Sequence, residues 1–168
     1  MNINIREASP EDTQAIMNLK LNYLNDSKTI PLNLDEYPND FSKELEIVHK
    51  LILEKNSTLL VAIVDGQIVG NIDIYGSQRK RLFHTAGIGM GIHNNWQNKG
   101  IGSLLMTYAV KWANKNEHLK LITLEVYETN LAAIHMYKKY NFKETGIIKN
   151  FFFQDDQYID NISMALHL

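Results

Sequence analysis

A strand rich in glycine, followed by a short loop and a helix, is the part of this sequence whose residue types are best suited to chemistry. Gly87, Gly89 and Gly91 alternate with apolar residues in a strand predicted from Leu82 to His93, so all three fall on one face of it. Glycine costs packing and conformational order, so we expect this face to be bare and to lie close to another chain or an extended ligand. A barrel-like bend of the strand is the structural alternative.

The loop after this strand reads Gln97-Asn98-Lys99-Gly100-Ile101-Gly102, and a helix is predicted from Ser103 to Lys115. Small residues allow several backbone N–H groups to point at one place together with the positive end of the next helix, which suits an anionic phosphate group. The spacing does not fit a Walker A loop, because Lys99 precedes its glycine. It does not fit a dinucleotide-binding fingerprint either, because the third glycine is missing.

A further group of polar residues lies downstream. A strand is predicted from Lys120 to Tyr127 and carries Glu125, and a short helix follows from Leu131 to Lys139. Helical spacing places four residues on one face of that helix, namely Asn130, Ala133, Tyr137 and Tyr140. An aromatic residue at this spacing is usually part of a core, so the chemistry of Tyr137 depends on its neighbours.

Together these stretches resemble the GCN5-related N-acetyltransferases, the GNAT superfamily. The loop from Gln97 to Gly102 resembles the family signature Q/R-x-x-G-x-G/A, and Ile92 lies five residues before it. The run from Leu124 to Phe142 is similar to the family's second acetyl-CoA motif, in which a strand, an Asn, a helix, a Tyr and a Gly-Phe pair follow one another. Asn98 and Asn141 replace two glycines of these motifs, and we expect both to keep the backbone conformation, because Asn tolerates the left-handed region well.

The resemblance implies an acetyl-CoA site formed largely by backbone groups, with no metal. The backbone of Met90, Gly91 and Ile92 would pair with pantetheine like an added strand, and the loop amides would hold the pyrophosphate. Asn130 would bond to pantetheine or to the adjacent backbone, and Ala133 would leave room for the cosubstrate. The implied cosubstrate-binding residues are Met90, Gly91, Ile92, Gln97, Asn98, Lys99, Gly100, Ile101, Gly102, Ser103, Asn130, Ala133 and Tyr137.

The resemblance also implies three catalytic roles. The Ile92 amide would polarise the thioester carbonyl, and Tyr137 would protonate the departing CoA thiolate. Glu125 is the first candidate for the base, because it matches a glutamate that serves as base in the family's ribosomal-protein alanine acetyltransferases. Asp73 and His93 are the second choices, and each of the three also has an ordinary structural interpretation.

The remaining pattern predicts an α/β (α+β) fold over residues 1–168 as a single domain. A mixed, mostly antiparallel sheet of about seven strands, flanked by about four helices, matches the GNAT fold. Ser9 to Asp12 predicts the start of the first helix, and Asp65-Gly66 predicts a tight hairpin turn. The second helix is expected to bury an apolar stripe of Phe41, Leu45, Val48 and Ile52.

Composition excludes several other classes of protein. The 168 residues include no cysteine, which excludes disulfides, thiolate-held metals and an acyl-cysteine intermediate. The 17 basic and 19 acidic residues lack the basic excess of a nucleic-acid-binding protein. No stretch resembles a signal peptide or a membrane span, so a cytoplasmic protein without a membrane partner is expected.

The expected acceptor is a primary amine on a small molecule such as an amino acid or a polyamine. The run from Tyr158 to Met164, together with Trp96-Gln97, is similar to the subgroup that acetylates amino acids and related amines. Acetylation of a protein N-terminus or lysine is the alternative within this class, and a CoA-binding regulatory module without turnover is the alternative outside it. The family is often dimeric, so a homodimer stays open, as does a contact between Arg79-Lys80-Arg81 and CoA. Acidic residues that could attract a cationic amine are Asp35, Glu36, Asp40, Asp155 and Asp156.

Overall fold

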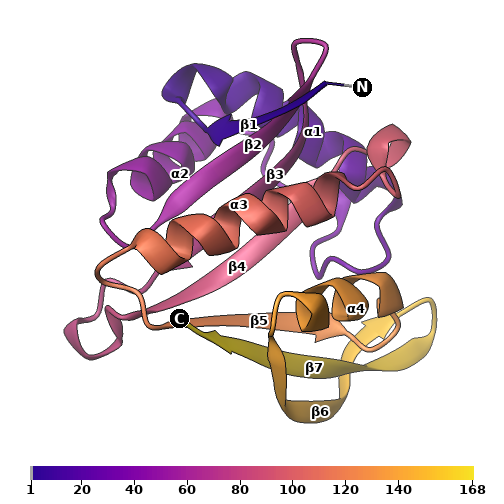
Figure 1. Cartoon of the computed structure of the whole chain (residues 1–168). Coiled ribbons are helices and arrows are strands. Elements are labelled where there is room, and N and C mark those ends of the chain that lie inside the picture. The colour runs from indigo at the N-terminus through magenta and orange to yellow at the C-terminus, as the bar shows by residue number, and fades with distance from the viewer. Residues whose placement is uncertain (1) are drawn as a thin grey trace.

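Seven strands form one sheet in the computed structural model, which describes residues 2–168 (Figure 1). The spatial order is β1-β2-β3-β4-β5-β7-β6, and every neighbouring pair is antiparallel except β4 and β5. The predicted mixed, mostly antiparallel sheet is thereby confirmed. The strands are Ile3–Glu7 (β1), Thr58–Val64 (β2), Gln67–Gly76 (β3), Thr85–Ile92 (β4), Leu121–Tyr127 (β5), Lys143–Gln154 (β6) and Gln157–His167 (β7).

Four α-helices cover the two faces of the sheet, as predicted. They are Thr13–Asp26 (α1), Phe41–Leu53 (α2), Ile101–Lys115 (α3) and Leu131–Lys139 (α4). Four single-turn 3-10 helices lie in the loops: Pro10–Asp12 (η1), Leu34–Glu36 (η2), Lys80–Leu82 (η3) and Asn94–Trp96 (η4). In the described residues, 2–168, no helix is both long and apolar enough to cross a bilayer.

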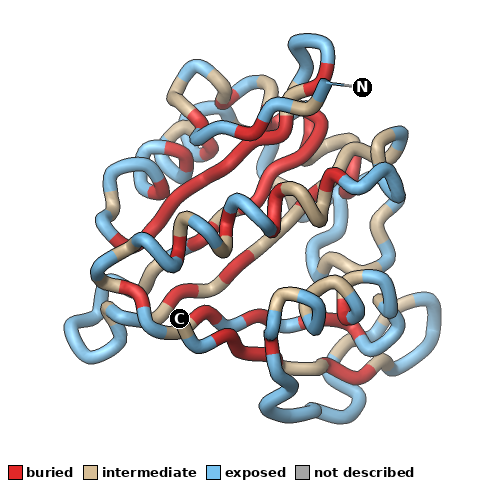
Figure 2. Tube along the Cα trace, viewed as in Figure 1, coloured by how far each residue is buried: buried red, intermediate tan, exposed pale blue. Residues whose placement is uncertain are grey.

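The alternation of side chains in β2 shows why both faces need cover. Leu60 and Ala62 belong to the core cluster that includes Leu105 of α3, whereas Leu59 and Val61 pack with apolar residues of α1 and α2. Successive residues of a strand point to opposite faces, so a strand that is apolar throughout must be covered on both. Figure 2 accordingly shows the central strands buried along most of their length.

The predicted turns and caps are largely confirmed. Asp65 and Gly66 both have positive φ, 48° and 79°, as a two-residue hairpin turn of the predicted kind requires. Asp12 accepts a hydrogen bond from the Ser9 backbone N–H (2.8 Å), but η1 comes first and α1 begins at Thr13.

Two predictions about local structure are wrong. The strand predicted from Leu82 starts instead at Thr85, because the Leu82 N–H donates to the Arg79 carbonyl (2.8 Å) and closes the turn of η3. In α2, Phe41 and Ile52 are exposed, whereas Glu44 is only 3% exposed. Glu44 forms a 2.7 Å ion pair with Lys20 of α1, so a polar contact between the two helices turns part of the expected apolar stripe outward.

Candidate active site

The outer edge of β4 is left open where β4 and β5 separate. The two strands pair only at Thr85–Gly87 and Leu121–Thr123, and beyond this point Figure 1 shows them diverging. The His93 N–H donates to the Val69 carbonyl of β3 (2.9 Å). Because the N–H groups of a strand alternate between its two edges, those of Ile92 and Met90 point to the open edge. An extended ligand could therefore accept hydrogen bonds there.

The glycine face of β4 is not bare, contrary to the prediction. A Cβ atom at Gly87 would lie 2.2 Å from Cε2 of Tyr75, and one at Gly91 would lie 2.1 Å from Cε1 of Tyr23. At Gly89 it would lie 3.2 Å from the carboxylate oxygens of Asp73. The glycines make room for side chains from β3 and α1 that fold over the strand, so their immediate cause is packing by these three residues.

The loop between β4 and α3, called the anion loop below and formed by residues 97–102, has the backbone geometry of an anion site. Asn98 and Gly100 both have left-handed backbone angles, φ 58° and 82°, which confirms the conformation expected at Asn98. The Leu104 N–H makes the first intrahelical hydrogen bond of α3, to the Gly100 carbonyl (3.0 Å). The N–H groups of residues 101–103 consequently lie at the positive end of the helix with no acceptor within it.

Side chains of this loop stabilise the loop itself. The Gln97 amide nitrogen donates to the Ile92 carbonyl (3.3 Å) and to Asn94 (3.2 Å). The Lys99 ammonium lies 4.7 Å from the centroid of the Trp96 ring, a cation–π contact. These contacts engage the Gln97 and Lys99 side chains within the loop.

Helix α4 is fixed against the first turn of α3. Asn130 caps α4 by accepting a hydrogen bond from the Ala133 N–H (3.2 Å), which is the adjacent-backbone role that was one of its two expected roles. The Tyr140 hydroxyl donates to the Ser103 carbonyl (2.6 Å) and lies 2.7 Å from the Thr107 hydroxyl. The helix that carries Tyr137 is thereby tied to the loop that suits an anion.

Tyr137 has the surroundings of a proton donor. Its ring packs at a tilt against Phe142, with 5.7 Å between centroids, and its hydroxyl makes no hydrogen bond within the described chain. Burial raises the pKa of the Tyr137 hydroxyl to about 12, so the hydroxyl keeps its proton at neutral pH. A partly buried phenol that carries a proton, and whose hydroxyl has no partner among the described residues, can give that proton to a thiolate.

The strand register places two carboxylates in one row across the sheet. Asp73 of β3 pairs with Gly89 of β4, and Glu125 of β5 pairs with Ser163 of β7. Gly87 pairs with Thr123 in the parallel pair, so two residues further along both strands Gly89 and Glu125 lie opposite one another across the separating strands. Asp73 and Glu125 thus face the same side of the sheet, with only a glycine between them.

Each of these two carboxylates is held by an amide. Glu125 accepts hydrogen bonds from the Asn161 amide and from the Ser163 hydroxyl (2.7 Å), and Asp73 accepts a long one from the Asn71 amide (3.4 Å). Burial raises the pKa of Asp73 to about 6, a change that the charge of Lys20 opposes and that of Glu44 increases. Asp73 therefore titrates closer to neutral pH than an ordinary aspartate.

The other predicted candidates lie elsewhere. The His93 ring nitrogen Nδ1 accepts a hydrogen bond from the Asn95 N–H (3.2 Å) and begins η4, so this histidine serves the loop. Arg79, Lys80 and Arg81 lie before the start of β4, whereas the anion loop follows its end (Figure 1). The length of β4 thus separates this basic stretch from the loop.

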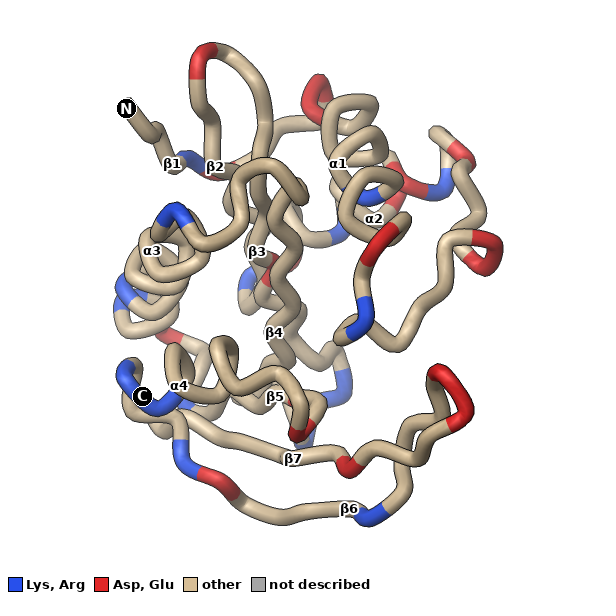
Figure 3. Tube along the Cα trace, turned by 90° about the vertical axis from the view of Figure 1, so that its right-hand side faces the viewer, with Lys and Arg blue, Asp and Glu red and all other residues tan. Residues whose placement is uncertain are grey.

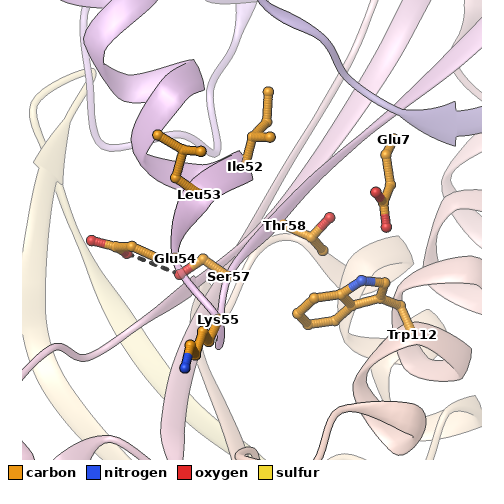
Figure 4. Close-up of a pocket in the computed structure, with 8 residues that line it drawn as sticks. All are labelled: Glu7, Ile52, Leu53, Glu54, Lys55, Ser57, Thr58 and Trp112. Atoms are coloured by element: carbon orange, nitrogen blue, oxygen red, sulfur yellow. Dashed lines mark hydrogen bonds between the residues drawn. The ribbon is translucent and has the colours of Figure 1, made fainter.

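The described structure has a pocket next to the carboxylate row and another away from it. One of ≈ 250 Å³ adjoins the carboxylate row and is lined by Tyr75, Gly76, Ser77, Thr85, Ala86, Gly87 and Thr123. The other, of ≈ 240 Å³, contains none of the predicted site residues (Figure 4). It is lined by Glu7, Ile52, Leu53, Glu54, Lys55, Ser57, Thr58 and Trp112. In the described part of the chain no three His, Cys, Asp or Glu side chains gather as metal ligands would.

Comparison with protein families decides the classification. The model of the Acetyltransferase (GNAT) family matches residues 25–142, which include the open strand edge, the anion loop and Tyr137. This chain belongs to the GNAT acetyltransferase family. The open edge of β4 and the loop from Gln97 to Gly102 are therefore features of a GNAT enzyme.

Individual relatives agree with this classification. L-amino acid N-acetyltransferase AaaT of Escherichia coli (strain K12) is 35% identical over 106 residues, which are 63% of this chain and 65% of that protein. The alignment thus spans slightly less than two thirds of that relative. The structure of a GNAT acetyltransferase from Streptococcus pneumoniae superposes with a TM-score of 0.95 at 27% identity, covering 99% of this chain and 100% of that one. The structure of yncA from Salmonella typhimurium with acetyl-CoA shares the fold, with a TM-score of 0.88 at 19% identity over 100% of this chain and 95% of that one.

Sequence reasoning missed several residues around the carboxylates. Asn161 and Ser163 stand two residues apart in a strand, a spacing that places both on one face, but nothing in the sequence pairs that face with Glu125. Tyr23 lies in α1, 68 positions before Gly91, and its contact with Gly91 arises only when α1 packs on β4. The ion pair of Lys20 with Glu44 likewise joins residues 24 positions apart in the sequence.

Proposed function

We propose that this GNAT enzyme transfers an acetyl group from acetyl-CoA directly to the primary amine of a small molecule, such as an amino acid or a polyamine. The observation that carries the proposal is the juxtaposition of an open β4 edge with the unpaired N–H groups at the start of α3. The relatives named above are consistent with it, since one is an amino-acid acetyltransferase and the structure of another contains acetyl-CoA.

The geometry fits two parts of acetyl-CoA, the pyrophosphate and the pantetheine arm. The N–H groups of residues 101–103 would bind the pyrophosphate, since they are donors at a positive helix end. The free N–H groups at Met90 and Ile92 would bind the pantetheine arm as an added strand edge, with Gly91 between them. Ala133, three residues after the Asn130 cap of α4, would leave room for the arm, as a small side chain does.

The chain's own groups then supply the catalytic functions. The Ile92 N–H would donate to the thioester carbonyl oxygen as negative charge develops on it. The acceptor nitrogen forms a bond to the carbonyl carbon, the carbon–sulfur bond breaks, and Tyr137 gives its proton to the leaving thiolate. Glu125 would take the proton that the amine loses.

Glu125 is placed better than Asp73 for the base. Glu125 lies on β5, the strand that borders the open edge, whereas Asp73 lies one strand beyond β4. Its Oε2 accepts both hydrogen bonds, from Asn161 and Ser163, so that Oε1 is free to accept a proton. The absence of cysteine from the sequence agrees with direct transfer, because the chain cannot form an acyl-cysteine.

Release of free CoA from acetyl-CoA tests this proposal. The purified chain is incubated with acetyl-CoA and a panel of amino acids, diamines, simple alkylamines and short peptides, and free thiol is measured over many turnovers. Steady thiol release that depends on one class of amine supports the enzyme. Tight binding of CoA without turnover for any acceptor supports a CoA-binding module instead, and a peptide as the best acceptor supports a protein acetyltransferase.

A further inference from the structure

The side of the sheet that carries the carboxylate row has more negative than positive groups. Neither Asp73 nor Glu125 forms an ion pair anywhere in residues 2–168. The cation whose charge acts on Asp73 is Lys20, but its Nζ lies 2.7 Å from Glu44, which is almost fully buried. One ammonium therefore faces two carboxylates, Asp73 and Glu44, and no ion pair of the described chain involves Glu125.

Hydrogen-bond acceptors without partners lie beside both carboxylates. The Asn71 and Asn161 side chains are 2% and 1% exposed, and each donates its NH₂ group to the neighbouring carboxylate. The amide oxygen of each has no hydrogen-bond partner in the described structure. A buried polar atom without a partner costs about 1–3 kcal/mol, so such atoms call for an explanation. Both oxygens are enclosed by the protein, and they add to the electronegative character of this face.

The spacing of the two carboxylates suits a ligand with two charged ends. Two strand spacings separate Asp73 and Glu125, so their Cα atoms are about 10 Å apart or more, since β4 and β5 diverge. The residue between them is Gly89, and the Asp73 carboxylate lies over it, where a Cβ would come within 3.2 Å of its oxygens. Burial raises the pKa of the Tyr75 hydroxyl, and the charges of Asp73 and Glu125 raise it further. Both carboxylates therefore lie close enough to Tyr75 for their charges to affect it.

We infer that the acceptor carries two cationic nitrogens and no carboxylate close to them, as an aliphatic diamine or polyamine does. Glu125 would face the amine that reacts, and Asp73 would bind the second ammonium. This inference rests on the proposed acetyl transfer and names its substrate class. Acidic residues of η2 and of the β6–β7 turn lie on the same side of the molecule and would attract such a cation (Figure 3).

An α-amino acid fits the same face poorly. Its carboxylate would enter a region that already holds Asp73, Glu44 and Glu125. Lys20, whose charge acts on Asp73, is paired with Glu44, and Lys28 is paired with Asp155 (3.0 Å). An α-carboxylate would therefore compete with Glu44 for Lys20, whereas a second ammonium would neutralise the charge of Asp73.

Three sets of acceptors of matched length test this inference. Acetyl-CoA is supplied with α,ω-diamines of three to five carbons, with the n-alkylamines of the same length, and with the ω-amino acids that replace the second ammonium by a carboxylate. We expect kcat/KM for the best diamine to exceed that of its matched alkylamine at least tenfold, and that of its matched ω-amino acid by more. Asp73→Asn should reduce the ratio of diamine to alkylamine toward one, whereas Glu117→Gln, at an exposed position between α3 and β5, should leave it unchanged.

The pH dependence supplies a second readout that a purely structural role of Asp73 would not produce. The groups that face Asp73 are Lys20 and Tyr23 from α1, Glu44 from α2, and Asn71 and Tyr75 from β3. The advantage of the diamine over the alkylamine should decrease as the pH falls below about 6, because Asp73 then takes up a proton and loses its charge. Asp73→Asn should abolish this pH dependence.

The possible failures are distinguishable. If no amine of any class releases CoA although the protein binds it, the proposed acetyl transfer is wrong. If CoA is released but alkylamines, ω-amino acids or α-amino acids match the diamines, the transfer stands and the inference about two cationic nitrogens is overturned.

Discussion

The Tyr140 hydroxyl donates a 2.6 Å hydrogen bond to the Ser103 carbonyl, and this contact joins α4 to the first turn of α3. Ser103 directly follows the anion loop, in the first turn of α3, and Tyr137 lies one helical turn before Tyr140. The proposed proton donor and the proposed pyrophosphate site are therefore positioned relative to each other by a side chain that belongs to neither. Two Tyr→Phe variants on one helix separate chemistry from positioning.

Tyr137→Phe should lower kcat by a factor of about 100 or more, because it removes the proposed general acid. Its hydroxyl makes no hydrogen bond within the described chain, so the variant should fold with a free energy of unfolding close to that of the original protein. Steady-state kinetics, with calorimetric titration of CoA, measure both effects. CoA affinity should change little, and an unchanged kcat would remove Tyr137 from the mechanism.

Tyr140→Phe is the matched variant and should show the opposite pattern. It deletes the hydrogen bond to Ser103 and the contact with Thr107, so the free energy of unfolding should fall by about 1–2 kcal/mol. CoA should bind more weakly, and kcat at saturating acetyl-CoA should fall less than tenfold. Denaturant unfolding and CoA titration give these values, and a loss of kcat as large as that of Tyr137→Phe would contradict the assigned roles.

Gly100→Ala should weaken CoA binding through the backbone. A Cβ at Gly100 meets nothing within 4 Å, but its φ of 82° is strained for any residue with a side chain, which costs about 1–2 kcal/mol. Relaxation of that strain would shift the N–H groups at the start of α3. Gly146→Ala is the control, since a Cβ there also meets nothing within 4 Å and its φ is not positive. Equal CoA affinity in both variants would count against the loop as the pyrophosphate site.

Asp73→Asn should stabilise the protein at alkaline pH. Burial raises the pKa of Asp73 to about 6, above the value of an unfolded aspartate, so the native state binds more protons than the unfolded state between about pH 4 and 6. The stability of the original protein should therefore fall as the pH rises through that window. Removing the charge should raise the free energy of unfolding by about 1–3 kcal/mol at pH 8 and by little at pH 4.

Chemical denaturation at the two pH values measures this difference. Asp156→Asn, in the exposed turn between β6 and β7, should change stability little at either pH. A stabilisation by Asp73→Asn that is the same at pH 4 and pH 8 would show that charge burial is not its cause.

The local elements of the fold were largely predictable, because their signals are local. The Asp65-Gly66 turn, the left-handed Asn98 and Asn141, and the helix that follows Asn130 all depend on neighbouring residues. The errors arose where contacts between residues far apart in the sequence determine which side chains are buried. Phe41 and Ile52 are exposed because Glu44 is paired with Lys20 of another helix, and no periodicity in α2 contains that information.

The same division holds for the candidate site. The left-handed backbone of the loop at Asn98 and Gly100 and the helix after it could be predicted from the residues of that stretch. The glycine face of β4 was misjudged, since its cover comes from Tyr23 on α1 and from Asp73 and Tyr75 on β3. The placement of Asp73 and Glu125 in one row needed the strand order, because four elements separate these residues along the chain.

A single-turnover experiment tests direct transfer most directly. The enzyme, in excess over acetyl-CoA with a labelled acetyl group, is mixed with an amine that supports turnover, and protein and small molecules are separated and analysed by mass spectrometry at successive times. Direct transfer predicts that the label passes from acetyl-CoA to the acceptor amine as free CoA appears, with no acetylated protein at any time. An acetylated protein that forms before the acetylated amine and then decays, or release of acetate without an acetylated amine, would contradict the account.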